Sequence, residues 1–410
     1  MIDFGEVNRL EYAEVNEGDR WIYIADFNIN HSGDELKSTA RINSEVKDIQ
    51  RLRSKGARIA ILAHQGRFED NDTEDLDFIV PHLSSRLGIT VKYFPENTTP
   101  AAVEFTKALA PGEVAIMGNT RKNKGEEEND PQLSDLFSLL GDSVAVGAFG
   151  KAHRSNASNG ALLDIIPAFI AQSQITEMDQ LIYWAGKRVV PVATLESATR
   201  EVYSVAVLGG AKKEKITDGL AGFVKSYSYV IPGGIVLNTL LKVMGYDIGD
   251  SLITDEGKSF ETEAEAALNG NESIIYIPRR LMVAKKTEEG FLDPFEVRTM
   301  DGVPQGYMIV DFFVESEAKA ALGQAVNGHG RIVMAGTPGI YAAGFKRATD
   351  MVMSYMKSPK VRGIVLGGDT AAEVKYDGAV STGGGSALYF VAHGTTPVFE
   401  ALKQNKLKFG

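Results

Sequence analysis

The sequence contains no cysteine. Disulfide bonds, thiol catalysis and cysteine-based metal sites are therefore excluded, which is typical of a cytosolic protein. No apolar run approaches the roughly 18 residues that a membrane-spanning helix requires, and residues 1–15 lack the basic region and apolar core of a secretory signal. We therefore expect a cytoplasmic protein that has no membrane partner.

Positive charge is also in short supply. Lysine and arginine number 43 against 54 aspartates and glutamates, so the formal net charge is −11. This balance argues against nucleic-acid binding, because affinity for a phosphate backbone comes from lysine and arginine. An acidic protein that binds anionic ligands has to concentrate its cations locally. The six histidines show no metal-ligand spacing, no Ser/His/Asp constellation is visible, and His31 and His82 match no pattern.

Short apolar runs alternate with helix-like segments along the 410 residues, a length that favours two domains. The alternation is typical of βαβ units that build a parallel sheet, whose buried strands are nearly continuous apolar runs. We therefore predict an α/β fold with two similar halves. The expected strands lie within residues 21–30, 58–67, 89–94, 113–121 and 143–150 of the first half and 204–210, 227–234, 273–278, 306–312, 331–339 and 363–371 of the second.

One longer helix is predicted over residues 167–185, followed by a polar stretch over residues 194–203. We place the domain boundary within residues 165–200. Two α/β halves joined by a helix favour a ligand cleft that closes by hinge motion.

Polar and cationic residues follow the expected strands of the first half, and ligands of α/β sheets bind beyond the carboxyl ends of strands. Arginine suits such a site because its planar fork binds phosphate or carboxylate through two parallel hydrogen bonds. Any single arginine is more often an exposed surface residue, and a structural hydrogen bond explains His64 about as well as a ligand does. Taken together the set predicts an anion site: Asp26, Asn28, Arg41, His64, Arg67, Arg121, His153 and Arg154.

Glycine follows the expected strands of the second half, in residues 209–212, 232–234, 335–339, 367–371 and 381–387. Glycine lets backbone N–H groups approach a phosphate closely, and a helix that starts there adds a favourable dipole. A single glycine pair is more simply a turn, but five at strand ends favour a nucleotide-type site. No loop has the GxxxxGK[ST] pattern. Asp369 could hold Mg²⁺, which binds one or two carboxylates together with phosphate oxygens.

An arginine-rich half and a glycine-rich half together indicate a two-substrate phosphoryl-transfer enzyme. Such enzymes depend on positioning and charge neutralisation more than on acid–base groups.

At this point the motifs match a known pattern, because the chain resembles phosphoglycerate kinases. "ADFNIN" is similar to the family's V-D-F-N-V-P, "AHQGR" to S-H-L-G-R, and "GAFGKAHRSNAS" to D-A-F-G-x-A-H-R-x-x-A-S. "GNTRKNKGEEENDP", "VLGGAKKEKI", "LGGDTA" and "STGGGSA" resemble further family motifs, in order, from about residue 24 to residue 390.

The resemblance implies two Rossmann-like three-layer domains with parallel sheets, joined by an interdomain helix. Residues 1–172 would bind 3-phosphoglycerate or 1,3-bisphosphoglycerate, residues 173–200 would connect the domains, and residues 201–390 would bind Mg-nucleotide. We expect residues 391–410 to form a tail that packs back on the N-terminal domain. The implied reaction is reversible phosphoryl transfer between 1,3-bisphosphoglycerate with ADP and 3-phosphoglycerate with ATP, with Mg²⁺ as cofactor, in a monomer.

The resemblance also implies roles for individual residues. Arg41 would steady the carboxylate and the transferring phosphoryl group, and Asp369 would bind the metal. The implied catalytic residues are Arg41, Lys212, Gly384 and Gly385. The implied acceptor-binding residues are Asp26, Asn28, Arg41, His64, Arg67, Arg121 and Arg154. The implied nucleotide-binding residues are Gly210, Ala211, Lys212, Lys215, Gly234, Gly336, Gly368, Asp369, Thr370 and Gly383.

Departures from the family pattern fall mostly on the nucleotide side. Ala335 replaces an asparagine, Ala342 replaces the glutamate that takes the ribose hydroxyls, and the lysine loop is one residue shorter. Other departures are Leu366 in place of a glycine, Gly118 in place of a glutamate, Gly147 in place of an aspartate, and a longer connection over residues 187–203.

Three functions are therefore compared. The first is a glycolytic phosphoglycerate kinase in divergent form. The second is a kinase of this fold that activates another phosphorylated or phosphonylated carboxylate for biosynthesis. The third is a non-catalytic ligand-binding relative, against which Lys212, Asp369 and "STGGG" argue because a binder of the acceptor alone would not need them.

Overall fold

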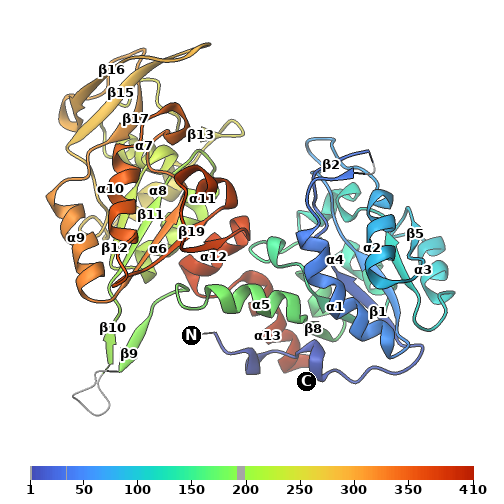
Figure 1. Cartoon of the computed structure of the whole chain (residues 1–410). Helices are drawn as coiled ribbons and strands as arrows, with labels where there is room; N and C mark the ends of the chain where they lie inside the picture. The colour runs from blue at the N-terminus through green and yellow to red at the C-terminus, as the bar shows by residue number, and fades with distance from the viewer. Residues whose placement is uncertain (1, 34, 192–198) are drawn as a thin grey trace. The chain divides into compact units, whose positions relative to one another are not determined.

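The computed structural model describes residues 2–33, 35–191 and 199–410, which form two compact units (Figure 1). The N-terminal unit contains Ile2–Gln180 together with Thr396–Gly410. The C-terminal unit contains Leu181–Thr395. Residues 194–198 of the polar stretch predicted over 194–203 lie outside the described residues.

A six-stranded parallel sheet forms the centre of the N-terminal unit, in the order β5-β6-β4-β1-β7-β8. The chain adds strands on one side of β1 and then crosses to β7 on the other, so the topological switch point lies between β1 and β7. The strands are mostly buried on both faces, as parallel strands are. Their bounds are β1 (Arg20–Ile24), β4 (Arg58–Leu62), β5 (Lys92–Phe94), β6 (Val114–Met117), β7 (Ser143–Val146) and β8 (Ala168–Ile170).

The remaining elements of this unit are helices and one small hairpin. The helices α3, α4 and α13 each begin with proline behind a threonine or aspartate whose side chain accepts a backbone N–H bond. The helices are α1 (Ala40–Ser54), α2 (Val80–Leu87), α3 (Pro100–Lys107), α4 (Pro131–Ser138), α5 (Gln172–Leu181) and α13 (Pro397–Phe409), and the hairpin is β2 (His31–Ser32) with β3 (Glu35–Leu36). Short 3-10 helices lie at Phe4–Glu6, Leu10–Tyr12, Asp77–Ile79, Thr120–Lys122, Lys124–Glu126, Phe149–Lys151 and Ala161–Asp164.

The single helix predicted over 167–185 is wrong at both ends. Residues 168–170 pair with β7 as strand β8, and α5 starts only at Gln172. The carboxyl group of Asp48 accepts the N–H groups of Gln172 at 3.1 Å and Ser173 at 2.8 Å, which fixes the start of α5. This cap comes from a residue 124 positions away in the chain, so local sequence spacing does not reveal it.

The C-terminal segment belongs to the N-terminal unit through helix α13. The buried side chain of Asn405 donates to the carbonyls of Leu163 and Ile166 and accepts from the N–H of Ala168 at 2.8 Å. The segment begins at Thr396 rather than at residue 391, because the preceding helix, α12 (Gly384–His393), continues to His393.

A five-stranded parallel sheet forms the centre of the C-terminal unit, in the order β12-β11-β18-β19-β20. Its strands are β11 (Ser204–Leu208), β12 (Tyr229–Pro232), β18 (Arg331–Ala335), β19 (Arg362–Leu366) and β20 (Ala379–Ser381). The strand predicted over 273–278 does not form. Ile275 makes only a single parallel bridge to Val230 at the sheet edge.

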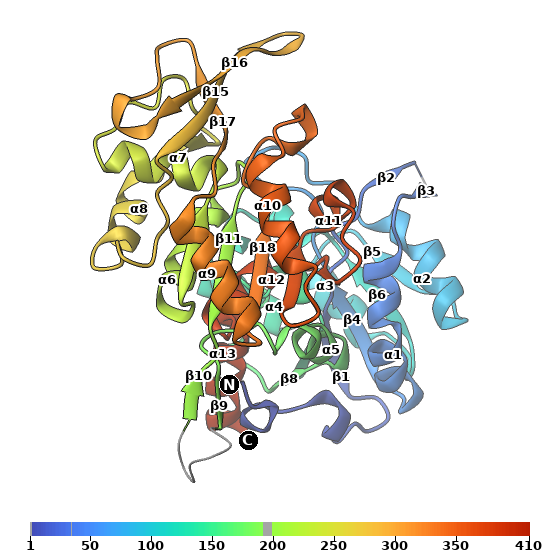
Figure 2. The same ribbon diagram turned by 60° about the vertical axis from the view of Figure 1, so that its left-hand side comes forward.

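A three-stranded antiparallel sheet, in the order β16-β15-β17, was not predicted. Figure 2 shows its hairpin, β15 (Arg280–Thr287) with β16 (Gly290–Arg298), as a long arm of the C-terminal unit. The strand predicted over 306–312 exists as β17 (Met308–Phe312), but it pairs with β15 instead of joining the parallel sheet. Two smaller antiparallel pairs are β9 (Val189–Pro191) with β10 (Thr199–Glu201) and β13 (Thr254–Asp255) with β14 (Lys258–Ser259).

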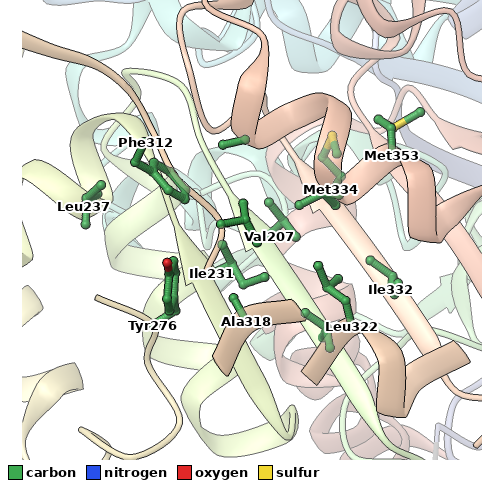
Figure 3. Packing of buried hydrophobic residues seen from close by; sticks show 14 of the residues in the cluster. Val207, Ile231, Leu237, Tyr276, Phe312, Ala318, Leu322, Ile332, Met334 and Met353 are labelled. Atoms are coloured by element: carbon green, nitrogen blue, oxygen red, sulfur yellow. The ribbon is translucent and has the colours of Figure 1, made fainter. Parts of the chain in front are cut away.

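Side chains of the parallel sheet pack against helices in the core of the C-terminal unit (Figure 3). Val207, Ile332 and Met334 of the sheet share one buried cluster with Leu322 of α9 and Met353 of α10. The helices are α6 (Ala221–Ser226), α7 (Gly234–Val243), α8 (Glu261–Leu268), α9 (Ser316–Asn327), α10 (Arg347–Met356), α11 (Gly368–Val374) and α12 (Gly384–His393), with a π-helical segment over Lys215–Leu220 and 3-10 helices at Thr299–Asp301 and Tyr341–Ala343.

Arg331, the first residue of β18, is fully buried and forms no ion pair with a carboxylate of the described residues. Its guanidinium donates to Ser204 Oγ at 2.7 Å, to the Tyr183 carbonyl at 3.1 Å and to the Gly186 carbonyl, and lies 4.5 Å from the ring centre of Tyr227. A buried charge is tolerated only when its donors are satisfied. Arg331 therefore attaches the segment that follows α5 to the sheet.

We expect Arg331→Met to lower the free energy of unfolding by about 2–3 kcal/mol, because two carbonyls and one hydroxyl lose their donor in a buried site. Urea denaturation measures the loss. Arg362→Met is the matched control: Arg362 is exposed and lies 4.3 Å from the Tyr183 ring centre, so its loss should stay within about 1 kcal/mol. Equal losses in the two variants would contradict the role given to Arg331.

Candidate functional site

Four loops leave the carboxyl edge of the N-terminal sheet, after β1, β4, β6 and β7. Each brings a polar side chain that is largely removed from water. Asp26 is 6% exposed, His64 4%, Arg121 7% and Lys151 5%. Buried charges are rare unless they are paired or bind a ligand, so this edge is the strongest candidate site of the unit.

The cations of these loops lie close enough to influence one another. Burial holds the pKa of His64 well below its usual range, and the charges of Lys151, Arg121, Arg41 and Arg154 add to the effect. The Nδ1 of His64 is buried without a hydrogen-bond partner in the described part of the chain. A bound anion would reverse the electrostatic part of this penalty.

Arg121 experiences the same crowding. Burial lowers the pKa of its guanidinium, and the nearby charges of Arg154 and Arg67 act in the same direction, against Glu127 and Glu126. The structure thus brings together the arginines that the sequence singled out, namely Arg41, Arg67, Arg121 and Arg154.

Carboxylates and carbonyls orient these arginines. Arg41 donates to Asp26 Oδ1 and to the Asn28 carbonyl, both at 3.1 Å. Arg121 donates to the Gly66 carbonyl at 2.6 Å and pairs with Glu127 at 3.2 Å. Asn28 contributes here through its backbone, while its side chain is exposed.

Lys151 is a site cation that the sequence reading missed. Its ammonium donates to Ser158 Oγ at 2.9 Å and pairs with buried Glu126 at 3.3 Å. Glu126 also accepts from Thr120 Oγ1 at 3.1 Å and from the Ser158 N–H at 3.0 Å, so the pair joins the loops after β6 and β7. Its position three residues before Arg154 could have indicated a site residue. Lysines are mostly exposed, however, so the sequence alone favoured a surface position.

Glu45 of α1 is a second missed residue. Its Oε1 accepts the Asp26 N–H at 2.9 Å, while burial raises the pKa of Glu45 well above its usual range. A Cβ on Gly147 would lie 2.2 Å from Tyr23 Oη and 3.0 Å from Glu45 Oε2. Glycine at 147, where the resembling family has aspartate, is thus required by the side chains of Tyr23 and Glu45.

One face of α1 connects the loop after β1, which carries Asp26, with the start of α5. Arg41, Glu45 and Asp48 are spaced at i, i+4 and i+7 and therefore share a face. Arg41 holds the side chain of Asp26, Glu45 holds its N–H, and Asp48 caps α5.

Glu45→Gln tests this buried carboxyl group. The pKa of Glu45 is higher in the folded than in the unfolded chain. The contribution of this carboxyl group to the free energy of unfolding is therefore fully present below the unfolded pKa and is lost as pH rises through the folded pKa. Glutamine keeps the acceptor for the Asp26 N–H and removes the ionisation. We expect Glu45→Gln to melt a few degrees above the wild type at pH 8, with a gap that shrinks toward pH 4.5.

The control is Glu113→Gln. Hydrogen bonding to Lys92 lowers the pKa of Glu113, so the sign is opposite and this variant should be less stable than the wild type above the unfolded pKa. Melting temperatures measured between pH 4.5 and 8 test both variants. A higher melting temperature for the wild type than for Glu45→Gln at pH 8 would contradict the raised pKa of Glu45.

Glycines at the carboxyl edge of the C-terminal sheet serve two purposes. A Cβ on Gly209 would lie 2.0 Å from the Thr337 carbonyl oxygen, one on Gly234 2.2 Å from that of Gly210, and one on Gly336 2.4 Å from that of Gly209. These glycines let three loops pack backbone against backbone, as the simple folding explanation requires.

Gly210 and Gly384 behave differently. Both have positive φ, 88° and 58°, and an added Cβ would meet nothing within 4 Å. Their backbones therefore border open space, which suits close approach of a ligand. Gly384 begins α12 behind Gly383, so the N–H groups of that helix start point out of the "STGGG" loop.

Lys212 and Lys215 lie next to this edge. Lys215 begins the π-helical segment Lys215–Leu220, and such segments are frequent at functional sites. Burial and the charge of Lys212 lower the pKa of Lys215 to about 8. Lys213 is tied elsewhere, by its N–H to Asp255 at 2.8 Å and by an ion pair with Glu256.

Asp369 is exposed in the first turn of α11, followed by Thr370. Among the described residues no group of three His, Cys, Asp or Glu could hold a metal ion. A single exposed carboxylate at a helix start nevertheless fits Mg²⁺ that arrives with phosphate oxygens, which need only one or two protein carboxylates.

A cavity of about 470 Å³ lies in the C-terminal unit beside the glycine loops. Gly210, Ala211 and Gly234, all predicted from the sequence, line it together with apolar side chains such as Ile235 and Phe291. Its size and apolar lining are those of a small-molecule site. Phe291 was missed because it comes from the unpredicted β15–β16 hairpin.

No helix among the described residues is long and apolar enough to cross a membrane.

Comparisons with known proteins agree with this geometry. The family model described as phosphoglycerate kinase matches residues 14–393. The phosphoglycerate kinase of Zymomonas mobilis is 31% identical, over 94% of this chain and 97% of the relative, and that of Methylorubrum populi is 29% identical, over 98% and 99%. The fold is similar to that of the phosphoglycerate kinase of Coxiella burnetii, with a TM-score of 0.68 at 24% identity over 97% and 99% of the two chains.

Proposed function

Because this chain belongs to the phosphoglycerate kinase family, we propose that it transfers a phosphoryl group reversibly between ATP and the carboxyl group of 3-phosphoglycerate, giving ADP and 1,3-bisphosphoglycerate. The observation that carries the proposal is the cluster of cations beyond the N-terminal sheet, where burial and the neighbouring positive charges hold the pKa of His64 well below its usual range. A small acid with a phosphate group is the ligand that neutralises such a site.

The N-terminal unit binds the acceptor. Arg41, held by Asp26, steadies the carboxylate and the phosphoryl group in transfer. Buried Arg121 and the partly exposed Arg67 and Arg154 bind the far phosphate together with His64, with bidentate contacts from arginine. This set is His64, Arg67, Arg121 and Arg154.

The C-terminal unit binds the nucleotide. Lys212 and Lys215 neutralise its phosphates, and Gly210, Ala211, Gly234, Gly336 and Gly368 let the backbone approach them. Asp369, with the adjacent Thr370, holds Mg²⁺, which supplies charge neutralisation when bound.

In the forward direction a carboxylate oxygen of the acceptor forms the new bond to the γ-phosphorus while the bond to the ADP oxygen breaks. No proton has to be moved, so positioning and charge neutralisation supply the catalysis. The N–H groups of Gly383, Gly384 and Gly385 stabilise the phosphoryl group in flight at the start of α12.

Family membership favours this reaction over activation of another carboxylate and over ligand binding without catalysis. A coupled assay with Mg-ATP and 3-phosphoglycerate, with hydroxylamine to trap the acyl phosphate, tests it. We expect turnover on the order of 1–100 per second. Binding of Mg-nucleotide without turnover would instead support a different acid, and absence of both would support a non-catalytic role.

Arg41→Ala should lower turnover at least about a hundredfold, because a charge that stabilises the transition state is lost. The control is Arg86→Ala, which removes an exposed arginine from the last turn of α2 in the same unit and should leave turnover unchanged. Steady-state kinetics of both variants measures the effect. Undiminished turnover in Arg41→Ala would remove Arg41 from the catalytic set.

A further inference from the structure

The cavity of the C-terminal unit has a single carboxyl group in its lining. Among its described lining residues, Glu373 is the one acid and Lys286 the one base. Ala342 lines the same cavity with an exposed methyl group, which offers no hydrogen bond. The polar recognition that a side chain at 342 cannot supply therefore has to come from another element.

Glu373 is placed by helix α11. It follows Asp369 by four residues, so the two side chains share a face about 6 Å apart along the helix axis. Glu373 also lies near Tyr341, since its charge contributes to raising the pKa of that phenol, after burial and Asp350. The carboxyl group of Glu373 thus lies one helical turn from that of Asp369 and beside the loop that carries Ala342.

Hydrogen-bond acceptors without donors line this cavity. Within the described ranges, Glu373 makes no hydrogen bond and no ion pair. Asn238 is 3% exposed and donates through Nδ2 to the Leu252 carbonyl at 2.9 Å, while its buried Oδ1 has no partner in the described structure. A buried acceptor left without a donor is costly, so the cavity is built for a ligand that donates hydrogen bonds.

We propose that Glu373 accepts hydrogen bonds from the ribose hydroxyl groups of the bound nucleotide. The inference rests on the proposed function only in that the ligand is a nucleotide. A ribose begins at the α-phosphate, so its hydroxyls lie within about one helical turn of phosphates held near Asp369. Glu373 thereby makes the site selective for ribonucleotides without a carboxyl group at position 342.

Calorimetric titration with Mg-ADP and with its 2′,3′-dideoxy analogue tests the proposal without requiring turnover. The wild type should bind Mg-ADP about tenfold more tightly than the analogue, which is the expected effect of a hydrogen bond to a charged group. Glu373→Ala should lose about tenfold for Mg-ADP and nothing for the analogue. Glu373→Gln should fall between, because its amide oxygen still accepts. The double variant Ala342→Glu/Glu373→Ala, which moves the carboxyl group to position 342, should restore part of the preference for Mg-ADP over the analogue.

Equal losses for Mg-ADP and the analogue in Glu373→Ala would overturn the proposal, because they would indicate a disturbed helix rather than a lost ribose contact. Absence of Mg-ADP binding to the wild type would overturn it as well. The expected binding pattern without turnover of 3-phosphoglycerate would support Glu373 and overturn the proposed function, so the two failures are distinguishable.

Discussion

Mutual repulsion among the cations at one sheet edge is the constraint on which the N-terminal unit depends. Arginine and lysine side chains converge there from several loops, and each would move into solvent if nothing held it. Asp26, Glu126 and Glu127 each hold one of them. The unit keeps its cations close together, and their charges add to the burial that holds the pKa of His64 well below its usual range.

The residues that position Asp26 in turn constrain the surrounding structure. Glu45 has to be buried on α1 to hold the backbone of Asp26, and its neighbour Tyr23 leaves no room for a side chain at Gly147. The same helix face ends in Asp48, which starts α5. The position of Asp26, the glycine after β7 and the start of α5 thus all depend on one face of α1.

The carboxyl edges of the two parallel sheets present polar groups in different ways. The N-terminal edge concentrates charged side chains, whereas the C-terminal edge is built of loops whose backbones pack against one another through Gly209, Gly234 and Gly336. Backbone donors need no countercharge, so this edge contains few buried ions. Phe291 and Glu373 reach the cavity wall of this unit from elements outside the parallel strands.

Local pattern alone determined most of the apolar strands of the two parallel sheets and the cationic and glycine-rich loops after them, because a strand and the loop that follows it are contiguous in the chain. It did not reveal β8, which was predicted as part of a helix, or β20. Tertiary structure decided the rest. The start of α5 depends on Asp48, the pairing of β17 depends on a distant hairpin, and the burial of Lys151 depends on Glu126. Each of these outcomes is set by a partner far away in the sequence, and the energy of a buried charge or an unpaired N–H is defined only once that partner is in place.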